Sequence, residues 1–348
     1  MHIASMHPIA LARSGIAAIC TVGVVGLACA EAPLPVAPMP SRGASTPAER
    51  GVNEWLMRMH EASRLRGYVG TFVVTSSNGS MSSARIWHAC DGDQQVERVE
   101  ALTGPPRSTF RRNQDVVTFL PASHVVRSER RETLGLFPSL VKSADNSIEE
   151  FYSARRLGAD RVAGFEADVV ALVPRDNLRY GYRVWSERKT GLVVKLQTLD
   201  GEGKVLEQSA FSELVLDAPV RVDKLNQMMS ATDGWRVERP EVRKTSATDE
   251  GWQLREAVAG FKPVNCYRRL LEGPAGEGAL QWIFSDGLAA VSLFVENFDG
   301  RRHVQEGSSS SGATNTLARR IQDWWVTAVG EVPAPTLRAF ASSLERRK

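Results

Sequence analysis

The stretch from residue 179 to residue 216, RYGYRVWSERKTGLVVKLQTLDGEGKVLEQSAFSELVL, constrains the fold of this chain more than any other part of its sequence. Apolar and polar residues alternate in three runs, and a period of two residues is that of a β-strand. The KTG sequence at residues 189–191 and the dipeptide Asp200-Gly201 separate the runs, and both are typical of tight turns. The stretch therefore predicts three consecutive antiparallel strands, whose apolar face must be buried against another layer.

Further strand candidates precede this meander. Five short runs between residues 67 and 120 are separated by turn sequences such as Asn78-Gly79. A capping-box sequence at residues 46–49, followed by apolar residues at helical spacing up to Leu65, predicts a helix. Residues 147–157 are a second helix candidate. We count about ten strands before residue 220 and no alternation of strands with helices, so the sheet should be antiparallel. A sheet of this size curls, and the helices are expected to fill its concave side.

The composition changes after residue 225, which divides the chain into two domains. The polar residues 226–242 are interpreted as a linker between an N-terminal domain, residues 48–225, and a smaller one, residues 243–348. The fold class is therefore α+β: a large curved antiparallel sheet covered by helices, followed by a smaller α+β domain. In the second domain we expect a hairpin around Ser285-Asp286-Gly287, a flexible loop at residues 307–312, a strand over residues 317–329 and a terminal helix over residues 334–348.

The first thirty residues have the pattern of a secretory signal peptide. Arg13 is followed by an uncharged, mostly apolar run over residues 14–30, which is too short to span a bilayer comfortably. The run ends in Ala28-Cys29-Ala30, an A-x-A cleavage sequence. We expect residues 1–30 to be removed and the Pro-rich residues 31–47 to form a disordered tail. A retained anchor and a lipoprotein signal centred on Cys29 are the alternatives.

The charge of the exported chain gives no sign of nucleic-acid binding. Removal of residues 1–30 leaves a formal net charge of +2, against +3 for the whole chain, and no basic stripe is interleaved with aromatic residues. Cys90 and Cys266 are then the only cysteines. In an oxidising compartment these two residues can form a disulfide or stay as separate thiols.

Catalytic and cofactor-binding motifs are absent from the sequence. It contains no G-x-S-x-G nucleophile elbow, no H-E-x-x-H zinc motif, no phosphate-binding P-loop and no C-x-x-C. His88, Cys90 and Asp91 are metal-ligand types close together, but no second cluster completes a tetrahedral site. We therefore expect a binding protein and not an enzyme, with no cofactor and no bound metal.

Short motifs in both halves of the chain resemble the RseB/MucB family. In the first half these are residues 180–185 (YGYRVW), Leu192 and residues 206–208 (LEQ). In the second half they are Gly251-Trp252, Gly260-Phe261, residues 284–288 (FSDGL) and residues 328–333 (AVGEVP). The resemblance covers most of the chain, from about residue 50 to about residue 345, in the expected order.

The resemblance implies a periplasmic regulator of a sigma-E type envelope-stress sigma factor. Such proteins bind the periplasmic domain of a single-span, RseA/MucA-like anti-sigma factor and protect it from the site-one protease. The family's large domain is similar to the lipoprotein carrier and receptor proteins LolA and LolB, and its small domain is implied to carry most of the anti-sigma-factor contact. Lipopolysaccharide or mislocalised lipid is implied to bind and release the complex, and a homodimer is left open.

The two implied sites can be assigned to candidate residues. The candidates for a lipid cavity are apolar residues of the large domain: Tyr68, Phe72, Val74, Trp87, Phe119, Leu136, Phe137, Tyr182 and Trp185. Because side chains alternate along a strand, at most one of Tyr182 and Trp185 can line a cavity. The candidates for the anti-sigma-factor surface are Arg319, Arg320, Trp324 and Trp325, since aromatic residues and arginine dominate binding hot spots. Ordinary core packing would explain at least half of the cavity set, and a buried Trp pair with a solvated basic edge would explain the other set.

Two other functions are weighed against this one. A LolA-type periplasmic carrier of lipid or lipoprotein would account for the sheet and the cavity but leaves residues 243–345 without a role. An exported hydrolase would rest on His88, Cys90 and Asp91 alone.

Overall fold

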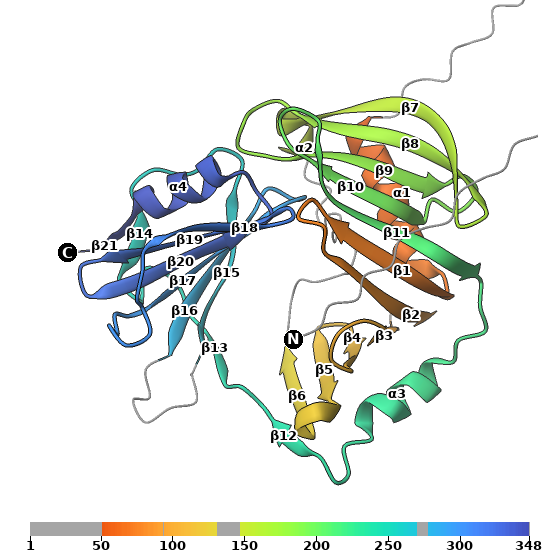
Figure 1. Ribbon diagram of the computed structural model, residues 1–348, viewed down its shortest axis with the longest axis horizontal. Helices are drawn as coiled ribbons and strands as arrows, with labels where there is room; N and C mark the ends of the chain where they lie inside the picture. Colours follow the sequence, from red (N-terminus) through yellow and green to blue (C-terminus); the bar gives the residue numbers. More distant parts are fainter. Residues whose placement is uncertain (1–50, 93, 131–146, 270–277, 348) are drawn as a thin grey trace, which may run out of the picture. The chain divides into compact units, whose positions relative to one another are not determined.

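The predicted meander lies within a large sheet in the computed structural model, which describes residues 51–92, 94–130, 147–269 and 278–347 (Figure 1). Its strands β9 (Gly181–Glu187), β10 (Val193–Leu199) and β11 (Val205–Leu216) follow one another and pair antiparallel, as expected. Gly191, between β9 and β10, has a φ of +87°, a left-handed conformation that glycine adopts without steric cost. Local alternation and turn residues were therefore sufficient to predict this part of the fold.

Twelve strands of the described chain form the large sheet, in the order β12-β6-β5-β4-β3-β2-β1-β11-β10-β9-β8-β7. The remaining members are β1 (Tyr68–Ser76), β2 (Met81–Asp91), β3 (Gln94–Ala101), β4 (Ser108–Arg112), β5 (Asp115–Leu120), β6 (Val125–Arg130), β7 (Tyr152–Val162), β8 (Phe165–Pro174) and β12 (Arg236–Glu238). Neighbours pair antiparallel except β12 and β6, which are parallel. Strand β12 comes from the predicted linker, residues 226–242, and joins the large sheet.

Helices cover both faces of this sheet. Helix α1 (Val52–Leu65) packs through Trp55 and Met59 against the face that carries Tyr182. Helix α3 (Val222–Ser230) packs against Phe110 and Phe119, which lie on the opposite face. We expected the helices on one concave side only, and this expectation is wrong for α3. Strands β2 to β6 carry an apolar row on their second face, and burial of that row requires a cover of its own.

Helix α2 (Ser147–Phe151) is shorter than predicted. The helix was expected over residues 147–157, but β7 begins at Tyr152 and pairs with β8 along its length. Pairing along a whole strand satisfies the backbone hydrogen bonds of the segment, so this tertiary contact overrides the local helical pattern. A single 3₁₀ turn (Pro121–Ser123) joins β5 to β6.

A second sheet of seven strands forms the C-terminal domain, in the order β13-β15-β16-β17-β20-β19-β18. Its strands are β13 (Val242–Lys244), β15 (Lys262–Arg269), β16 (Ala279–Ser285), β17 (Ala290–Asn297), β18 (Gly307–Ser311), β19 (Thr314–Ile321) and β20 (Trp324–Gly330). Helix α4 (Ala334–Ser343) packs on one face, beside a two-stranded ribbon of β14 (Trp252–Leu254) and β21 (Leu344–Arg346). The predicted fold class, a large antiparallel sheet with helices followed by a smaller α+β domain, is confirmed.

Three local predictions in this domain are wrong. Residues 307–312 are not a flexible loop, because β18 pairs with β19 through its backbone. Residues 317–329 form two strands and not one, since the chain turns at Gln322, whose φ is +54°. The terminal helix ends at Ser343, because the following residues pair with β14 instead of continuing the helix.

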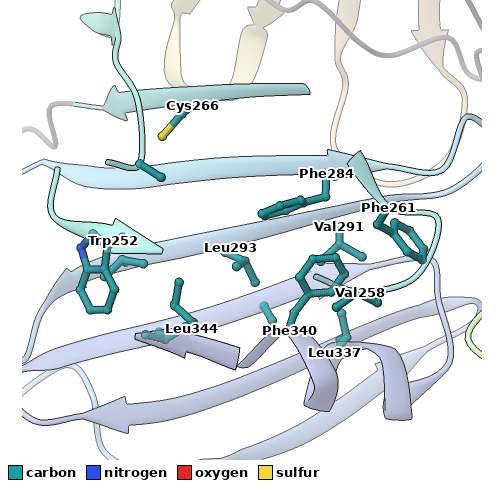
Figure 2. Close-up of a cluster of buried hydrophobic side chains, with 14 of the residues drawn as sticks. Trp252, Val258, Phe261, Cys266, Phe284, Val291, Leu293, Leu337, Phe340 and Leu344 are labelled. Carbon is teal, nitrogen blue, oxygen red and sulfur yellow. The ribbon is translucent and has the colours of Figure 1, made fainter. Parts of the chain in front are cut away.

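The small domain has a core of its own beneath α4. Figure 2 shows Phe261, Phe284 and Phe340 gathered between the helix and the sheet, with ring centroids 5.6 Å apart for Phe261 and Phe340 and 4.8 Å apart for Phe284 and Phe340. Leu337 and Phe340 of α4 are 1% and 0% exposed. A residue that loses all contact with water contributes its full hydrophobic transfer free energy, so these side chains hold α4 on the sheet.

The two sheets belong to one compact unit, Glu49–Lys348. None of the described helices is long and apolar enough to cross a membrane. The predicted signal peptide, residues 1–30, and the predicted tail, residues 31–47, lie outside the described residues.

Candidate functional site

Four of the predicted cavity residues share the face of the large sheet beneath α1. Tyr68, Phe72 and Val74 alternate along β1 and therefore point to the same side. The cross-strand register connects that side with the side of Val184, and hence of Tyr182, whose ring packs in one cluster with residues of α1. Tyr68, Phe72 and Tyr182 are buried and Val74 is half-buried. This face supplies a continuous apolar surface under the helix.

The other described candidates lie on the opposite face. Trp87 pairs with Val69 and not with Tyr68, and Phe119 belongs to the cluster beneath α3. Trp185 lies on the other face of β9 from Tyr182 and its indole N–H donates to Asp160 Oδ2 over 2.9 Å, although its ring belongs to the buried cluster of Tyr68 and Phe72. Tyr182 and Trp185 thus occupy opposite faces, as strand alternation requires. Leu136 and Phe137 lie outside the described residues. The nine candidates therefore cannot all line one cavity.

A polar row continues the α1 face across β1 to β4. Tyr68, His88, Glu97 and Arg111 are successive cross-strand partners. The rings of Tyr68 and His88 stack 4.9 Å apart, and His88 Nδ1 donates to the carbonyl oxygen of Arg66 over 2.8 Å. Burial raises the pKa of Tyr68 and of Glu97, whereas the positive charge of Arg111 lowers the pKa of Glu97. One face of the sheet thus combines an apolar half with a polar half.

The cluster of His88, Cys90 and Asp91 does not form a metal site. His88 is buried and already used by its stack and its hydrogen bond. Burial raises the pKa of the Cys90 thiol, and the charge of Asp91 raises it further, so the thiol resists conversion to the thiolate that binds metals. Within the described ranges, no three His, Cys, Asp or Glu side chains are placed to hold a metal ion.

The buried position of His88 leads to a specific prediction for how the stability of the protein depends on pH. Burial lowers the pKa of His88 below its ordinary value of 6.5, so below pH 6.5 the unfolded chain takes up a proton that the folded chain does not. The stabilisation by neutral His88 is therefore present above pH 6.5 and lost as the pH falls through the lowered pKa. We expect His88→Phe to weaken this loss by up to about 1.4 kcal/mol per pH unit, which urea unfolding between pH 7.5 and pH 5 would measure. An unchanged pH dependence would contradict this role.

The four predicted partner-binding residues divide between the two faces of the small sheet. Arg319 pairs with Val326, which lies in the core under α4, so Arg319 faces the helix. Trp324 faces the same side and meets Trp252 edge-to-face at 5.6 Å. The guanidinium of Arg346 lies 4.6 Å from the Trp324 ring.

Arg320 and Trp325 face the other side of that sheet. Trp325 is buried and stacks on His303, with ring centroids 4.9 Å apart. The guanidinium of Arg320 lies 3.9 Å from the ring of Phe298. The four residues consequently do not form one continuous surface, and only the pair of Arg319 and Trp324 lies on the α4 side.

Two neighbouring hollows lie between α4 and strands β18 and β19. Their volumes are about 240 and 400 Å³, and Leu317 and Arg338 line both of them. Arg319 lines the larger one and donates from Nη1 to the carbonyl oxygen of Ala341 over 3.4 Å. The hydroxyl groups of β18 line the smaller one, beside an exposed strand edge. We call these two hollows the α4 groove. Its two arginines outnumber its one acidic residue, Glu306, and suit an acidic, extended ligand.

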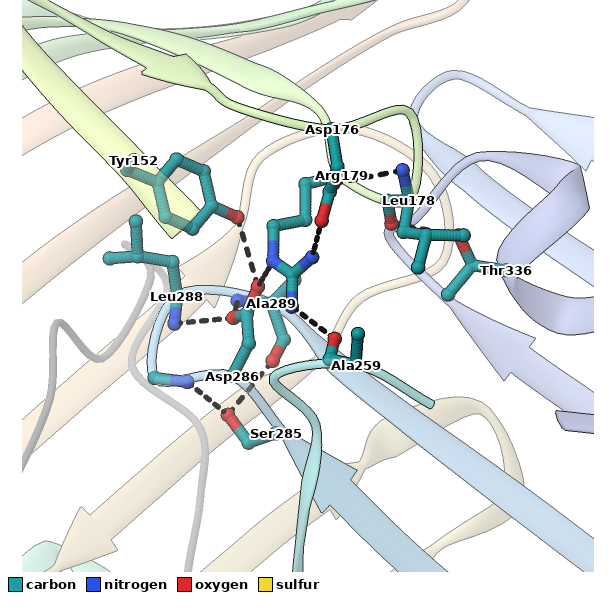
Figure 3. Close-up of polar contacts among 11 residues, drawn as sticks. Tyr152, Asp176, Leu178, Arg179, Ala259, Ser285, Asp286, Leu288, Ala289 and Thr336 are labelled. Carbon is teal, nitrogen blue, oxygen red and sulfur yellow. Dashed lines mark hydrogen bonds and ion pairs between the residues drawn. The ribbon is translucent and has the colours of Figure 1, made fainter. Parts of the chain in front are cut away.

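A buried polar network joins the two sheets at a second location (Figure 3). The β8–β9 loop, residues 175–180, places Arg179 against Asp286 of the β16–β17 turn, residues 286–289. Arg179 Nε donates to Asp286 Oδ2 over 2.8 Å, and the hydroxyl of Tyr152 donates to the same oxygen over 3.0 Å. Arg179 Nη2 donates to the carbonyl oxygen of Ala259 over 2.6 Å. The start of β7, the β8–β9 loop and the β16–β17 turn thus meet around one ion pair.

Sequence reasoning missed Arg179, Asp286 and Arg338. Asp286 was interpreted only as a turn residue, which it also is, because its Oδ1 accepts from the amides of Leu288 and Ala289. The position of Asp286 within the family-like sequence FSDGL was the one available signal. No local pattern relates it to Arg179, which is 107 positions earlier in the chain.

The possible disulfide between Cys90 and Cys266 does not form in the structure. Cys90 is half-buried on β2 of the large sheet, whereas Cys266 is buried in the core of the small domain, and both are free thiols. Burial raises the pKa of Cys266 to about 11, so its thiolate is scarce at neutral pH.

Comparison with known proteins gives matches over nearly all of the described chain. The family profile of the MucB/RseB N-terminal domain matches residues 51–229, and that of the MucB/RseB C-terminal domain matches residues 246–345. The sigma factor AlgU regulatory protein MucB of Pseudomonas aeruginosa is 32% identical over 302 residues, 84% of this chain and 90% of that protein. The sigma-E factor regulatory protein RseB of Haemophilus influenzae is 26% identical over 86% of this chain and 92% of that protein.

Two solved structures extend the similarity to the fold. A crystal structure of MucB in complex with MucA(peri) has a TM-score of 0.64 and 29% identity, and covers 85% of this chain and 98% of that one. The MucA/MucB complex of Pseudomonas aeruginosa has a TM-score of 0.66 and 28% identity, and covers 85% and 99%. These relatives are regulatory proteins, which confirms the expectation that the chain is not an enzyme.

Proposed function

This chain belongs to the MucB/RseB family, and we propose that it is a periplasmic negative regulator of sigma-E-type envelope-stress signalling. In this role it binds the periplasmic domain of a single-span anti-sigma factor and protects that domain from site-one proteolysis. The observation that carries the proposal is the match, over 85% of the chain, to a MucB structure in complex with MucA(peri).

The α4 groove is the part of the small domain that we propose for the anti-sigma factor. Arg319 and Arg338 supply positive charge there, and charge complementarity mainly sets the rate and specificity of association. Trp324 lies on the same side of the sheet and extends the surface with an aromatic ring. Arg320 and Trp325 would take part only if the partner also wraps around the other face.

The α1 face of the large sheet is the part that we propose for lipid or lipopolysaccharide. Tyr68, Phe72, Val74 and Tyr182 would provide the apolar surface that acyl chains require when the packing beneath α1 opens, because three of these side chains are buried in the closed core. Arg111, in the adjacent polar row, would receive the polar head of such a molecule. Binding there would favour the state of the protein that releases its partner.

A protection assay with a charge-reversal variant tests the proposed function. The mature protein should slow cleavage of the cognate anti-sigma factor's periplasmic domain by the site-one protease, and added lipopolysaccharide should reverse the effect. Arg338→Glu should weaken binding of that domain by about tenfold, because it reverses the charge of the α4 groove. Titration of the labelled domain would measure the affinity.

Arg221→Glu is the matched control for this variant. Arg221 is an exposed arginine at the start of α3 in the large domain, far from the α4 groove in the sequence, and its reversal should leave the affinity unchanged. Absence of protection by the wild-type protein would refute the proposed regulator. Lipid transfer between membranes without any protection would favour the LolA-type carrier instead.

A further inference from the structure

The ion pair that joins the two sheets is closed off from water. The side chains of Arg179 and Asp286 are both 0% exposed, and no other ion pair of the described residues has two fully buried partners. A buried charge is tolerated only while its partner and its hydrogen bonds are in place, because it has lost its hydration. If the sheets part, water reaches both charges and restores that hydration. In a partly opened junction the charges are neither paired with each other nor fully hydrated, so the intermediate is unfavourable. The ion pair therefore favours two discrete states, closed and open.

Arg179 is held on its own side of the junction by Asp176 and by the ring of Phe151. The three nitrogens of Arg179 are engaged by Asp286, by Asp176 of its own loop and by the carbonyl oxygen of Ala259. Its guanidinium lies 4.2 Å from the ring of Phe151 and 4.9 Å from the ring of Phe261. Phe151 ends α2 of the large domain and Phe261 precedes β15 of the small domain, so the cation contacts aromatic rings of both domains.

Asp286 is held equally firmly on its side of the junction. Its Oδ1 accepts from the amides of Leu288 and Ala289, at 2.9 and 2.7 Å, and this leaves Oδ2 directed at Arg179 and Tyr152. The turn thus presents a fixed acceptor and not a mobile carboxylate. Fixed geometry on both sides lowers the entropy cost of closing the contact.

The ion pair is in direct contact with the packing beneath α1. Tyr152, which donates to Asp286, is 0% exposed and belongs to the same cluster as Trp55 and Met59 of α1. Burial raises the pKa of Tyr152, so its hydroxyl keeps the proton that it donates. Leu288 of the β16–β17 turn packs against that cluster as well, although it comes from the small domain. Any rearrangement under α1 therefore reaches both sides of the ion pair.

Two neutral contacts flank the ion pair. The hydroxyl of Thr336 donates to the carbonyl oxygen of Leu178 over 2.7 Å, and Asn315 Nδ2 donates to the hydroxyl of Tyr180 over 2.8 Å. Water replaces neutral hydrogen bonds of this kind at little net cost, whereas a charged pair discriminates strongly between paired and unpaired states. Glu207 of β11 also accepts a hydrogen bond from the backbone of Ala313 between β18 and β19, but burial raises the pKa of this carboxyl group, so it is neutralised more readily. The state of the junction should accordingly be decided mainly by Arg179 and Asp286.

We propose that Arg179 and Asp286 form a two-state latch between the two domains, and that the packing beneath α1 sets whether the latch is closed. Closed, it holds the β8–β9 loop against the β16–β17 turn. Open, it lets the domains separate while each keeps its own core. The latch is a property of the chain itself and does not depend on which partner or lipid the protein binds.

Amide hydrogen exchange and small-angle X-ray scattering of the mature chain test the latch through Asp286→Asn. This variant keeps an Oδ1 acceptor for the turn but removes the charge that Arg179 requires. We expect exchange at residues 175–180 and 286–289 to become at least about tenfold faster and the radius of gyration to rise, with protection kept in β10 and β17. Asp217→Asn is the control, since it removes the same charge from an exposed ion pair with Arg66 and should change neither measurement.

Met59→Ala tests the coupling to the packing beneath α1. Met59 is 2% exposed in the cluster that contains Tyr152, so its truncation should also speed exchange at residues 286–289. In the Asp286→Asn background it should add nothing there, because the latch is already open. Independent, additive effects of the two changes would overturn the coupling.

Asp286→Asn could unfold the whole chain, which faster exchange in every strand would reveal. A less disruptive variant, Tyr152→Phe, then tests the latch. Tyr152→Phe removes one hydroxyl and keeps the ring, and it should speed exchange at residues 175–180 and 286–289 alone. Two results would overturn the latch. One is a folded Asp286→Asn variant whose exchange at these residues equals that of the wild type. The other applies if Asp286→Asn unfolds the chain, and is a Tyr152→Phe variant whose exchange there equals that of the wild type.

Discussion

Replacement of Phe340 by alanine should lower the free energy of unfolding by about 3–5 kcal/mol, since it removes a whole aromatic ring from a closed core. Phe340 is 0% exposed and lies between Phe261 and Phe284, the two rings that pack α4 against the sheet. The cavity left behind is lined by aromatic rings that cannot collapse without moving the helix. Guanidinium unfolding followed by circular dichroism would measure the loss.

Phe294→Ala is the matched control for this change. Phe294 lies on β17 of the same sheet, but it is half-buried and points away from α4, between the inward-facing Leu293 and Val295. The same chemical truncation should cost less than half as much there, because less apolar surface returns to water. Equal losses for the two variants would show that α4 is not held by the core that contains Phe340.

Patterns along a strand were sufficient to predict much of the large sheet. Asn78-Gly79 and the turns of the meander mark hairpins, and the strands on both sides alternate clearly. Strand β18 was missed because a run of serines has no apolar alternation, and its place is decided by backbone pairing with β19. Local signals thus identify strands that bury side chains, but not an edge strand held by its backbone alone.

The candidate site was less predictable, because it depends on which face each residue occupies. Tyr182 and Trp185 could be separated from the sequence, since they belong to one strand. That Trp87 and Phe119 lie on the opposite face of the sheet from Tyr68 could not be predicted, because such a prediction requires the register between strands. The pairing of Arg179 with Asp286 requires the contact between two domains, which no short sequence pattern encodes.

Gly260→Ala should destabilise the protein far more than the same change at another glycine of like conformation. Gly260 has a φ of +79°, where an alanine costs about 1–2 kcal/mol through its backbone alone. A Cβ there would also lie 2.8 Å from the ring of Phe151 and would strike Nη2 of Arg179, which bonds to the neighbouring Ala259. Overpacking of this kind adds about 1–3 kcal/mol to the loss of stability, because all the hydrogen bonds of Arg179 are in use and its side chain has no free space to move into.

Gly234→Ala isolates the steric part of this effect. Gly234 has a φ of +80°, but nothing lies within 4 Å of the position that a Cβ would take, so its substitution carries the backbone cost alone. The difference between the two variants in urea unfolding should therefore be about 1–3 kcal/mol. It should shrink in an Arg179→Ala background, where the guanidinium that the new methyl group strikes is gone. Equal losses of unfolding free energy for the two variants in the wild-type background would mean that the new methyl group at residue 260 does not strike Arg179. The tight packing around Arg179 in the closed latch would then be contradicted.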